Sequence, residues 1–341
     1  MNATDVERLS TSAAFTPSRK YLQLADDHVP FDQLSGKPNY ETKVIGALQN
    51  GRDVGILGPR GGGKSSLIAY VSTQLTARHI VLRVPVTGAD DPTKTANVTA
   101  VALGAALRTV DLATAERAEL QEARADQSST ARASGARGAS IGGGPLPFEL
   151  RGELRTLTEQ LATNQLADDR LAGLDRLISI LHNRDLSPVF VLEDTEAAIG
   201  GADNPELAAG FLNGPVRAFT QELQAPCIIA VQEAFKASTD YRDLVASVQD
   251  ITIPTLDRSS LATIVEHRLR REQIDEQATE LINNGAFSLL LAFYRESENS
   301  LRFTLSALQT AIGHAADMSA DRVEEGHMRA AVNEWKQHVA T

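Results

Sequence analysis

Residues 58–65 read Gly-Pro-Arg-Gly-Gly-Gly-Lys-Ser and fit the pattern Gly-x-x-x-x-Gly-Lys-Ser/Thr at every defined position. In such a loop the backbone N–H groups surround phosphate oxygens, and glycines are needed because the chain adopts conformations that side chains forbid. The motif therefore predicts a nucleotide site, in which Lys64 reaches the β- and γ-phosphates and Ser65 binds magnesium. The residues expected to contact the nucleotide are Gly58, Pro59, Arg60, Gly61, Gly62, Gly63, Lys64, Ser65 and Ser66.

Two flanking elements must position this loop. The apolar run 54–57 predicts a buried strand that ends at the loop, and residues 65–71 predict the helix that follows it. The free N–H groups and the dipole at a helix N-terminus attract anions. The alternative is a Gly-rich turn with a solvated lysine, and the strand–loop–helix context favours the phosphate site.

Composition is that of a globular protein. The chain has 341 residues, of which 42% are hydrophobic and 23% charged, and this excludes disorder of the whole chain. The formal net charge of -11 means that nucleic-acid binding would need a local basic patch. The N-terminus has neither a basic start nor an apolar stretch, and no apolar run approaches a membrane span, so neither a signal peptide nor a membrane segment is expected.

The single cysteine and the histidines carry no recognisable chemistry. Cys227 permits no internal disulfide, and its place in the apolar run 227–231 indicates a core residue rather than a nucleophile. The histidines form no pair at metal-ligand spacing, and there is no Gly-x-Ser-x-Gly motif. His182, His267 and His314 are interpreted as surface or boundary residues. A reducing, cytoplasmic location fits this cysteine usage best.

The apolar patterns alternate between strands and helices as far as residue 255 and are helical after it. Further strands are expected at 80–86, 188–194, 227–232 and 250–254, and further helices at 38–50, 93–110, 150–181 and 205–223. This α/β alternation predicts a three-layer αβα sandwich with a parallel sheet, of the P-loop NTPase kind, followed by a small all-helical domain of about four helices. We assign 1–50 to a lead-in with one helix, 51–255 to the nucleotide-binding core and 256–341 to the helical domain.

Residues 113–147 contain many glycines and serines and few large apolar side chains, which predicts a flexible insertion in the core. Two interpretations are open. The segment could contact a partner or line an assembled pore, or it could be a tolerated surface linker. The surface linker is the preferred interpretation.

Glu193 and Asp194 follow the apolar run 189–192 directly. Their carboxylates should therefore lie at the carboxyl edge of the sheet, where ligands bind in open α/β folds. A phosphate loop of this kind works with a carboxylate that holds magnesium and often with a second acid that polarises the attacking water. We assign Glu193 to magnesium, together with Ser65, and Asp194 or Glu193 to the water. The alternative is that these acids only end a strand and cap the next helix.

Another strand with its helices separates the two motif strands in the sequence, which is the layout of ATPases with an extra strand between them. The Asn-Lys-x-Asp guanine reader of GTP-binding proteins is absent, and Leu-Ser-Gly at 34–36 precedes the loop instead of following it as in transport-type ATPases. With these motifs the chain resembles the AAA+ ATPases, in particular the branch of replication initiators, helicase loaders and STAND-like proteins. The resemblance covers residues 38–339.

The resemblance implies two sensor residues. Gln232 ends the strand 227–232, where the family has the first sensor, which feels the γ-phosphate and orients water. Arg302 lies in a helical run similar to the second-sensor helix, whose arginine reaches from the lid onto the nucleotide. A polar strand end and a surface arginine are the alternative interpretations.

The resemblance also implies a homo-oligomer, a ring or a filament, in which an arginine of one subunit completes the site of its neighbour. Arg242 is the leading candidate for this arginine, and Arg217 and Arg258 are competitors. A solvated surface arginine is the alternative for each of them.

Two positions depart from the family pattern. Glu193 stands where the family usually has Asp, so hydrolysis is expected to be slow, and Gln232 replaces the usual Asn, Thr or Ser. Origin-binding initiators carry a winged-helix module after the lid, whereas this sequence ends at Thr341, so sequence-specific DNA reading is not expected.

The predicted function is an AAA+ ATPase that hydrolyses Mg-ATP and couples nucleotide state to lid motion and to self-assembly or remodelling of a protein partner. One alternative is a slowly hydrolysing switch or scaffold. Another is an ATP-dependent DNA-loading or transposition-type adaptor, although the net charge does not indicate nucleic-acid binding.

Overall fold

The computed structural model describes residues 1–12, 14–17, 21–34, 36–75, 78–84, 140–141, 174–175, 178–179, 181–183, 185–193, 205–245 and 248–339. The predicted helix 93–110, the predicted insertion 113–147 except residues 140–141, and most of the predicted helix 150–181 lie outside these ranges.

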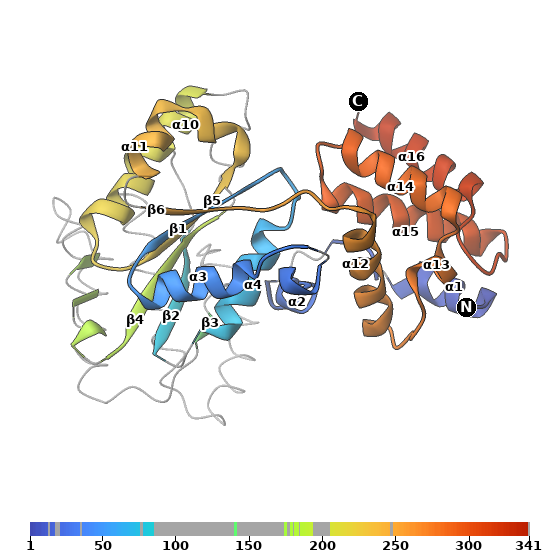
Figure 1. Cartoon of the computed structure of the whole chain (residues 1–341), viewed down its shortest axis with the longest axis horizontal. Coiled ribbons are helices and arrows are strands. Elements are labelled where there is room, and N and C mark those ends of the chain that lie inside the picture. Colours follow the sequence, from blue (N-terminus) through green and yellow to red (C-terminus); the bar gives the residue numbers. More distant parts are fainter. Residues whose placement is uncertain are drawn as a thin grey trace, which may run out of the picture. The chain divides into compact units, whose positions relative to one another are not determined.

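Five parallel strands form the centre of the α/β part. They are β1 (Asp53–Gly58), β2 (His79–Val84), β4 (Ser187–Leu192), β5 (Cys227–Gln232) and β6 (Val248–Thr252). A two-residue strand, β3 (Ser140–Ile141), pairs antiparallel with β2. The sheet order is β3-β2-β4-β5-β1-β6, and Figure 1 labels these strands. Strand β5 therefore lies between β1 and β4, which confirms the predicted extra strand between the two motif strands.

Helices connect and cover these strands. They are α3 (Tyr40–Gln49), α4 (Lys64–Gln74), α10 (Pro205–Phe211), α11 (Thr239–Val245), the π-helical turns η3 (Leu212–Val216) and η4 (Ala218–Glu222), and the 3-10 helix η5 (Glu233–Ala237). The predicted helix 205–223 is thus present but changes to π geometry after α10. Pro215 lies inside η3 and has no N–H to donate, so the regular α-helical ladder cannot pass through it.

Both faces of the sheet are buried, as a parallel sheet requires. On one face, Leu82 and Phe190 share a core cluster with Phe211 of α10. Side chains alternate between the faces along a strand, so Val81 and Val189 point to the opposite face, and both are buried as well. Helices on both faces give the three-layer αβα sandwich, and the predicted fold class is confirmed.

The C-terminal helices are α12 (Arg258–Arg271), α13 (Ala278–Leu281), α14 (Asn284–Glu296), α15 (Leu301–Asp317) and α16 (Glu325–Val339). The sequence predicts about four helices here and the structure has five, because a helical pattern around Asn283 is divided into α13 and α14. Asn283 interrupts it, because its side chain accepts a hydrogen bond from the N–H of Ala286 at 2.7 Å and so caps a new helix. Ile282 forms an isolated bridge with Val323 at the same point.

The N-terminal residues contain α1 (Ala3–Ser12), α2 (Tyr21–Asp26), the 3-10 turn η1 (Phe31–Gln33) and α3. The prediction of one helix in residues 1–50 is therefore wrong. Helix α1 packs against α15 and buries Val6 and Leu9. Gln309 of α15 donates to the carbonyl oxygen of Leu9 at 2.9 Å and accepts from the N–H of Phe15 at 2.9 Å. A short polar helix of this kind depends on tertiary packing, so its own pattern did not reveal it.

The chain divides into two compact units. The helical unit comprises Met1–Thr42, Gly58–Tyr70 and Thr252–Thr341, and the sheet unit comprises Lys43–Leu57 and Val71–Ile251. The N-terminal residues thus belong with the C-terminal helices instead of forming a separate lead-in. The phosphate loop, residues 58–65, also belongs to the helical unit.

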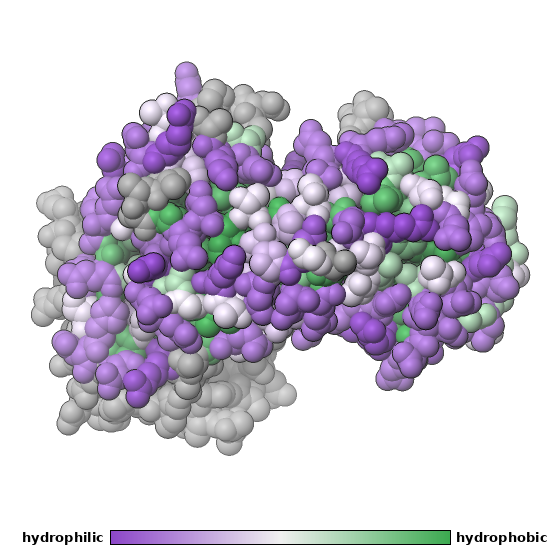
Figure 2. Space-filling model, viewed as in Figure 1, coloured by the Kyte–Doolittle hydropathy of each residue, from purple (hydrophilic) through white to green (hydrophobic). Residues whose placement is uncertain are grey.

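The surface is mainly hydrophilic on the face that Figure 2 shows. Within the described part of the chain, Leu207 and Met318 are the exposed large hydrophobic residues. Among the helices that the structure describes, none is long and apolar enough to cross a bilayer.

Candidate functional site

The phosphate loop joins β1 to α4, as the sequence predicts. Gly61 has φ 71° and Gly63 has φ 104°, conformations that residues with side chains rarely adopt. A Cβ placed on Gly63 would meet no heavy atom of the described residues within 4 Å, so the loop is open beside it. Helix α4 begins at Lys64, and the first N–H groups of a helix have no partner within the helix. The loop therefore offers backbone donors for an anion.

Lys64 is held at this loop by its own backbone. Its side chain is buried, and the Nζ ammonium donates to the carbonyl oxygens of Gly58 at 2.9 Å and of Pro59 at 2.8 Å. These two bonds keep the positive charge at the loop. An ammonium group donates in three directions, so phosphate oxygens can replace these acceptors.

Helix α15 meets the phosphate loop within the helical unit. The N–H of Arg302 donates to the carbonyl oxygen of Gly61 at 3.1 Å. A Cβ added to Gly61 would lie 2.5 Å from Ser300 Oγ and 2.9 Å from Arg302 Cβ. The side chain of Arg302 is exposed and forms no hydrogen bond with the described residues. The structure thus places the predicted second sensor next to the loop that it is expected to serve.

The turn before α15 has an unusual backbone. Glu298 has φ 54° and Asn299 has φ 61°, two consecutive left-handed residues without a glycine. The N–H of Asn299 donates to Tyr294 O at 2.9 Å, and the N–H of Ser300 donates to Ser297 O at 3.0 Å. Such conformations cost free energy and concentrate at functional sites. Here they direct the first turn of α15 at the loop.

Glu193 follows β4 and is 4% exposed. Its Oε2 lies 2.7 Å from Nε of Arg83 on the neighbouring strand β2. Arg83 pairs in register with Val191, two residues before Glu193, so both side chains lie on the same face of the sheet. Sequence reasoning missed this partner, although a lone arginine in the apolar run 80–84 was a visible signal. Asp194 lies outside the described residues, and its role stays a prediction.

Gln232 ends β5 and is partly exposed, and its side chain makes no hydrogen bond with another described residue. Strands β4 and β5 are parallel, with Leu192 opposite Ile229, so Gln232 and Glu193 lie at the same edge of the sheet. Ligands of open α/β sheets bind at this edge. The role of Gln232 remains a prediction.

The three arginines proposed for action between subunits differ in their surroundings. Arg242 of α11 is exposed, and its Nε donates to the carbonyl oxygen of Ser238 at 3.4 Å. Arg217 donates to Oε1 of Gln221 at 3.0 Å.

The third candidate, Arg258, donates to Asn284 Oδ1 at 2.9 Å and stacks 4.9 Å from the centre of the Phe287 ring. These contacts join α12 to α14, which gives Arg258 a role inside its own subunit.

Cys227 is buried, as predicted. Its N–H donates to Oδ1 of Asp53, at the start of β1, at 2.8 Å. Burial raises the pKa of Asp53 to about 6, which the hydrogen bond only partly offsets. Burial, and secondarily the negative charge of Asp53, raise the pKa of the Cys227 thiol well above its ordinary value. The thiol is therefore protonated at neutral pH and is a poor nucleophile.

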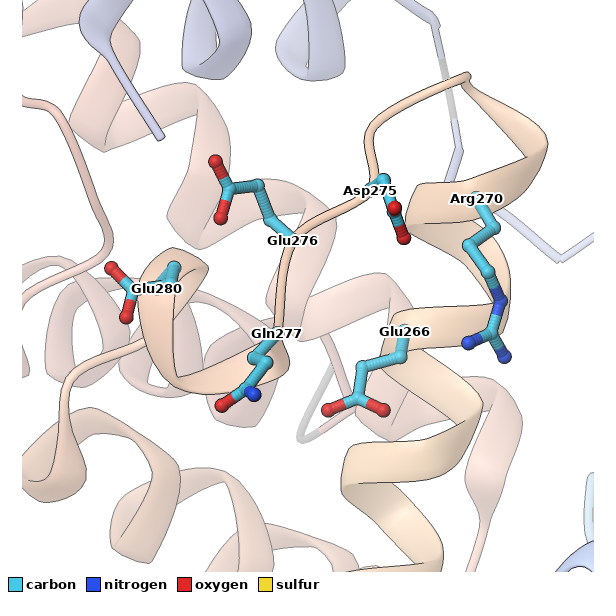
Figure 3. Close-up of a pocket in the computed structure, with 6 residues that line it drawn as sticks. All are labelled: Glu266, Arg270, Asp275, Glu276, Gln277 and Glu280. Carbon is cyan, nitrogen blue, oxygen red and sulfur yellow. The ribbon is translucent and has the colours of Figure 1, made fainter.

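A hollow of about 440 Å³ lies beside α12 and α13, and Figure 3 shows the six residues that line it. It is lined by Glu266, Arg270, Asp275, Glu276, Gln277 and Glu280. Glu276 pairs with the ammonium group of Met1 at 3.0 Å, and Glu266 accepts from the N–H of Ala278 at 3.2 Å. None of these residues belongs to the phosphate loop. Because four of the six are acidic, the hollow repels a triphosphate.

The donors at the phosphate loop fit a magnesium nucleotide. Backbone N–H groups and the Lys64 ammonium suit phosphate oxygens, and the oxygens of Ser65 and Glu193 are of the kind that Mg²⁺ prefers. Magnesium at such sites takes few protein ligands. In the described ranges no three His, Cys, Asp or Glu side chains gather to hold a metal alone.

The three histidines singled out in the sequence have no part in this site. His182, His267 and His314 are all at least partly exposed, as predicted.

No protein-family model matches the sequence, and no curated protein does. Among solved structures, the chain is similar to the Orc1 protein of Aeropyrum pernix in complex with DNA and to the Orc2 protein of the same organism in ADPNP–ADP complexes. Each match has 14% sequence identity and a TM-score of 0.50 and covers 93% of this chain. It covers 69% of the Orc1 chain and 72% of the Orc2 chain. At this identity the similarity is one of fold.

Proposed function

We propose that the chain is an ATPase of the AAA+ initiator kind, which binds Mg-ATP at residues 58–65 and hydrolyses it; the fold that it shares with the Orc1 and Orc2 structures supports this. The observation that carries the proposal is the meeting of two elements, the phosphate loop and the first turn of α15, at the bond between Gly61 and Arg302. A loop of this pattern alone indicates phosphate binding. An arginine brought to it by a second element supplies the additional charge that phosphoryl transfer needs.

Each polar residue of the site has a role in hydrolysis. Lys64 and Arg302 stabilise negative charge on the transferred phosphoryl group. Ser65 and Glu193 hold magnesium, which neutralises charge on the phosphate oxygens when bound. Asp194 or Glu193 accepts the proton of the attacking water, and Gln232 orients that water.

Nucleotide state reaches the lid helices through the same contact. ATP needs the backbone donors of the loop and brings charge beside Arg302, so its binding biases the position of α15. Loss of the γ-phosphate removes this bias. Self-assembly follows when Arg242 of one subunit reaches the γ-phosphate in its neighbour.

Calorimetric titration of ATP with magnesium into the purified chain tests the site. We expect saturable binding, weakened at least about tenfold in Lys64→Ala because a direct phosphate contact is lost. Lys43→Ala is the matched control, since Lys43 is exposed on α3 outside the loop. Absence of binding to the unaltered chain would overturn the proposal.

Light scattering after size exclusion tests assembly. We expect a larger mass in ATP or a nonhydrolysable analogue than in ADP, and a return to the smaller mass in Arg242→Ala. The same mass in all three nucleotides would contradict the assembly part of the proposal and favour a monomeric switch.

A slowly hydrolysing switch or scaffold is the second candidate. The Glu193–Arg83 pair favours it, because Arg83 already occupies an oxygen of the carboxylate that is assigned to magnesium. ATP-dependent partner binding should then survive Asp194→Asn, whereas an ATPase motor should lose its function with its turnover.

DNA loading is the third candidate, suggested by the Aeropyrum pernix Orc1 structure, which contains DNA. The net charge of -11 disfavours it. Duplex affinity that requires ATP and falls steeply with salt would support it, and no ATP-dependent binding at low salt would exclude it.

A further inference from the structure

Helix α11 carries Arg242. The residue before this arginine, Tyr241, forms a hydrogen bond with the sheet. The hydroxyl of Tyr241 donates to Oδ1 of Asp250 on β6, and the two oxygens are 2.5 Å apart. Tyr241 is 2% exposed. Burial, followed by the bond to Asp250, raises the pKa of Tyr241, so its hydroxyl keeps its proton and remains the donor at neutral pH.

The hydrogen bond lies against Gly55 of β1, where an added side chain would collide with it. A Cβ added to Gly55 would lie 2.6 Å from the Tyr241 hydroxyl oxygen and 2.9 Å from Oδ1 of Asp250. Gly55 has no φ in the left-handed range, so the backbone does not require a glycine there. The pair of polar atoms requires it.

Core packing and hydrogen bonds together orient this short helix, which buries Leu244 beside Tyr241. Helix α11 has seven residues, too few to be stable without packing. The hydroxyl of Ser238 accepts from the N–H of Tyr241 at 3.1 Å, and Asn213 donates to Asp240 at 2.7 Å, but the latter pair is exposed. Of these three hydrogen bonds, the Tyr241–Asp250 bond is the one that joins the helix to the sheet.

Arg242 is exposed beside this link. Successive residues of a helix point about 100° apart, so fixing the direction of Tyr241 also fixes the direction in which Arg242 leaves the subunit. Free rotation of α11 would spread the guanidinium over several ångströms, and displacements of about 1 Å already weaken catalysis.

We propose that Tyr241 and Asp250 are positioning residues for Arg242: their hydrogen bond, accommodated by Gly55, sets the direction in which this arginine is presented to a neighbouring subunit. The inference rests on the proposed role of Arg242 between subunits. It adds residues that the family resemblance did not indicate and that lie outside the nucleotide site.

Subunit mixing tests the inference. The donor subunit provides the arginine: it carries Glu193→Gln, so its own site is inactive, and its Arg242 is intact. The acceptor subunit provides the nucleotide site: it carries Arg242→Ala, and its Glu193 is intact. We expect their mixture to hydrolyse ATP faster than the two alone. Adding Tyr241→Phe to the donor should lower this activity about fivefold or more, because one positioning hydrogen bond is lost. Adding it to the acceptor should leave the activity within about twofold, since the acceptor's α11 is not used.

The outcomes separate the possible failures. No complementation between the two starting subunits contradicts the role of Arg242, and with it the premise. Two results overturn the positioning role. In one, Tyr241→Phe lowers the activity of the mixture equally in the donor and in the acceptor; in the other, it does not lower the activity when placed in the donor. Asp250→Asn in the donor keeps an oxygen acceptor and should preserve most activity, whereas Asp250→Ala should not. If Tyr241→Phe does not fold, the comparison of Asp250→Asn with Asp250→Ala tests the positioning role.

Discussion

The N–H of Arg302 donates a hydrogen bond to the carbonyl oxygen of Gly61 at 3.1 Å. The first turn of α15 and the phosphate loop are therefore joined by main-chain atoms, so the bond does not depend on the side chain of Arg302. Ser300 Oγ and Arg302 Cβ occupy the space where a side chain of Gly61 would lie. Helix α15 thus packs against a glycine of the nucleotide loop. A displacement of the loop at Gly61 therefore also displaces the first turn of α15.

Gly61→Ala should disturb both the loop and its helix contact. The φ of 71° is strained for alanine, and the new Cβ would lie 2.5 Å from Ser300 Oγ. We expect a loss of about 1–2 kcal/mol in the free energy of unfolding and ATP binding weakened about tenfold or more. Urea unfolding and calorimetric titration measure the two effects.

The matched control for this variant is Gly313→Ala. Gly313 lies inside α15, with no heavy atom of the described residues within 4 Å of a Cβ. This substitution should stabilise the protein by about 0.5–1 kcal/mol, because alanine loses less backbone entropy in a helix. Wild-type ATP affinity in Gly61→Ala would show that the contact has no part in the site.

Removal of Arg83 should destabilise the sheet unit. Arg83 is a partner of the buried carboxylate of Glu193, and the side chain of Arg83 is 28% exposed. We expect Arg83→Ala to lower the free energy of unfolding by about 2–3 kcal/mol, below the range of about 3–5 kcal/mol for a fully buried pair because Arg83 is partly exposed. The double variant Arg83→Met with Glu193→Gln should recover most of this loss. Urea unfolding of Arg83→Met, Glu193→Gln and the double variant measures the coupling. If the effect of the double variant equals the sum of the two single effects, the two groups are not coupled.

Asp53 should make stability depend on pH. Its pKa is about 6 in the folded chain against an ordinary value of 3.8, because burial disfavours the charged form. Between about pH 4 and 6 the folded state therefore keeps a proton on Asp53 that the unfolded chain releases. The stability that this proton contributes falls as pH rises through this window. Above pH 6 the full cost of the buried charge is present.

Asp53→Asn removes this titration while Oδ1 can still accept from the N–H of Cys227. We expect the variant to be more stable than the unaltered chain at pH 7 by about 1–2 kcal/mol, less than the full shift because Asp53 is partly exposed. The difference should shrink to near zero below pH 4. Unfolding curves from pH 4 to 7.5 give this comparison, and a difference independent of pH would contradict the assignment.

Asp27 should be needed for the N-terminal residues to fold with the helical unit. It is 6% exposed and lies 2.9 Å from Arg268, which is itself 9% exposed, and it also pairs with Arg271. Burial lowers the pKa of Arg268 to about 10, a sign that its charge is costly there. Asp27→Ala should cost about 3–5 kcal/mol, because two arginines lose their counter-charge.

The neighbouring residue provides the control for this test. Asp26 is exposed, and Asp26→Ala should change the free energy of unfolding by less than about 0.5 kcal/mol. Equal effects of the two substitutions in urea unfolding would mean that the buried pair contributes little.

The features that could be predicted are those that depend on residues adjacent in the sequence. The phosphate loop is defined by a continuous run of residues, and the strands are visible because both faces are buried and their sequences are apolar. The split at Asn283 was missed because an asparagine cap competes with a helix pattern that continues on both sides. Helix α1 was missed because its stability depends on packing against α15.

The sequence by itself thus determined the nucleotide loop, the order of strands and helices, and the helical character of the C-terminal part, since each depends on neighbouring residues and their period. Only the tertiary structure decided which distant groups meet: Arg302 with Gly61, Arg83 with Glu193, and Tyr241 with Asp250. These pairs follow no local pattern, because the folded backbone sets the distance between them and burial sets the strength of their interaction.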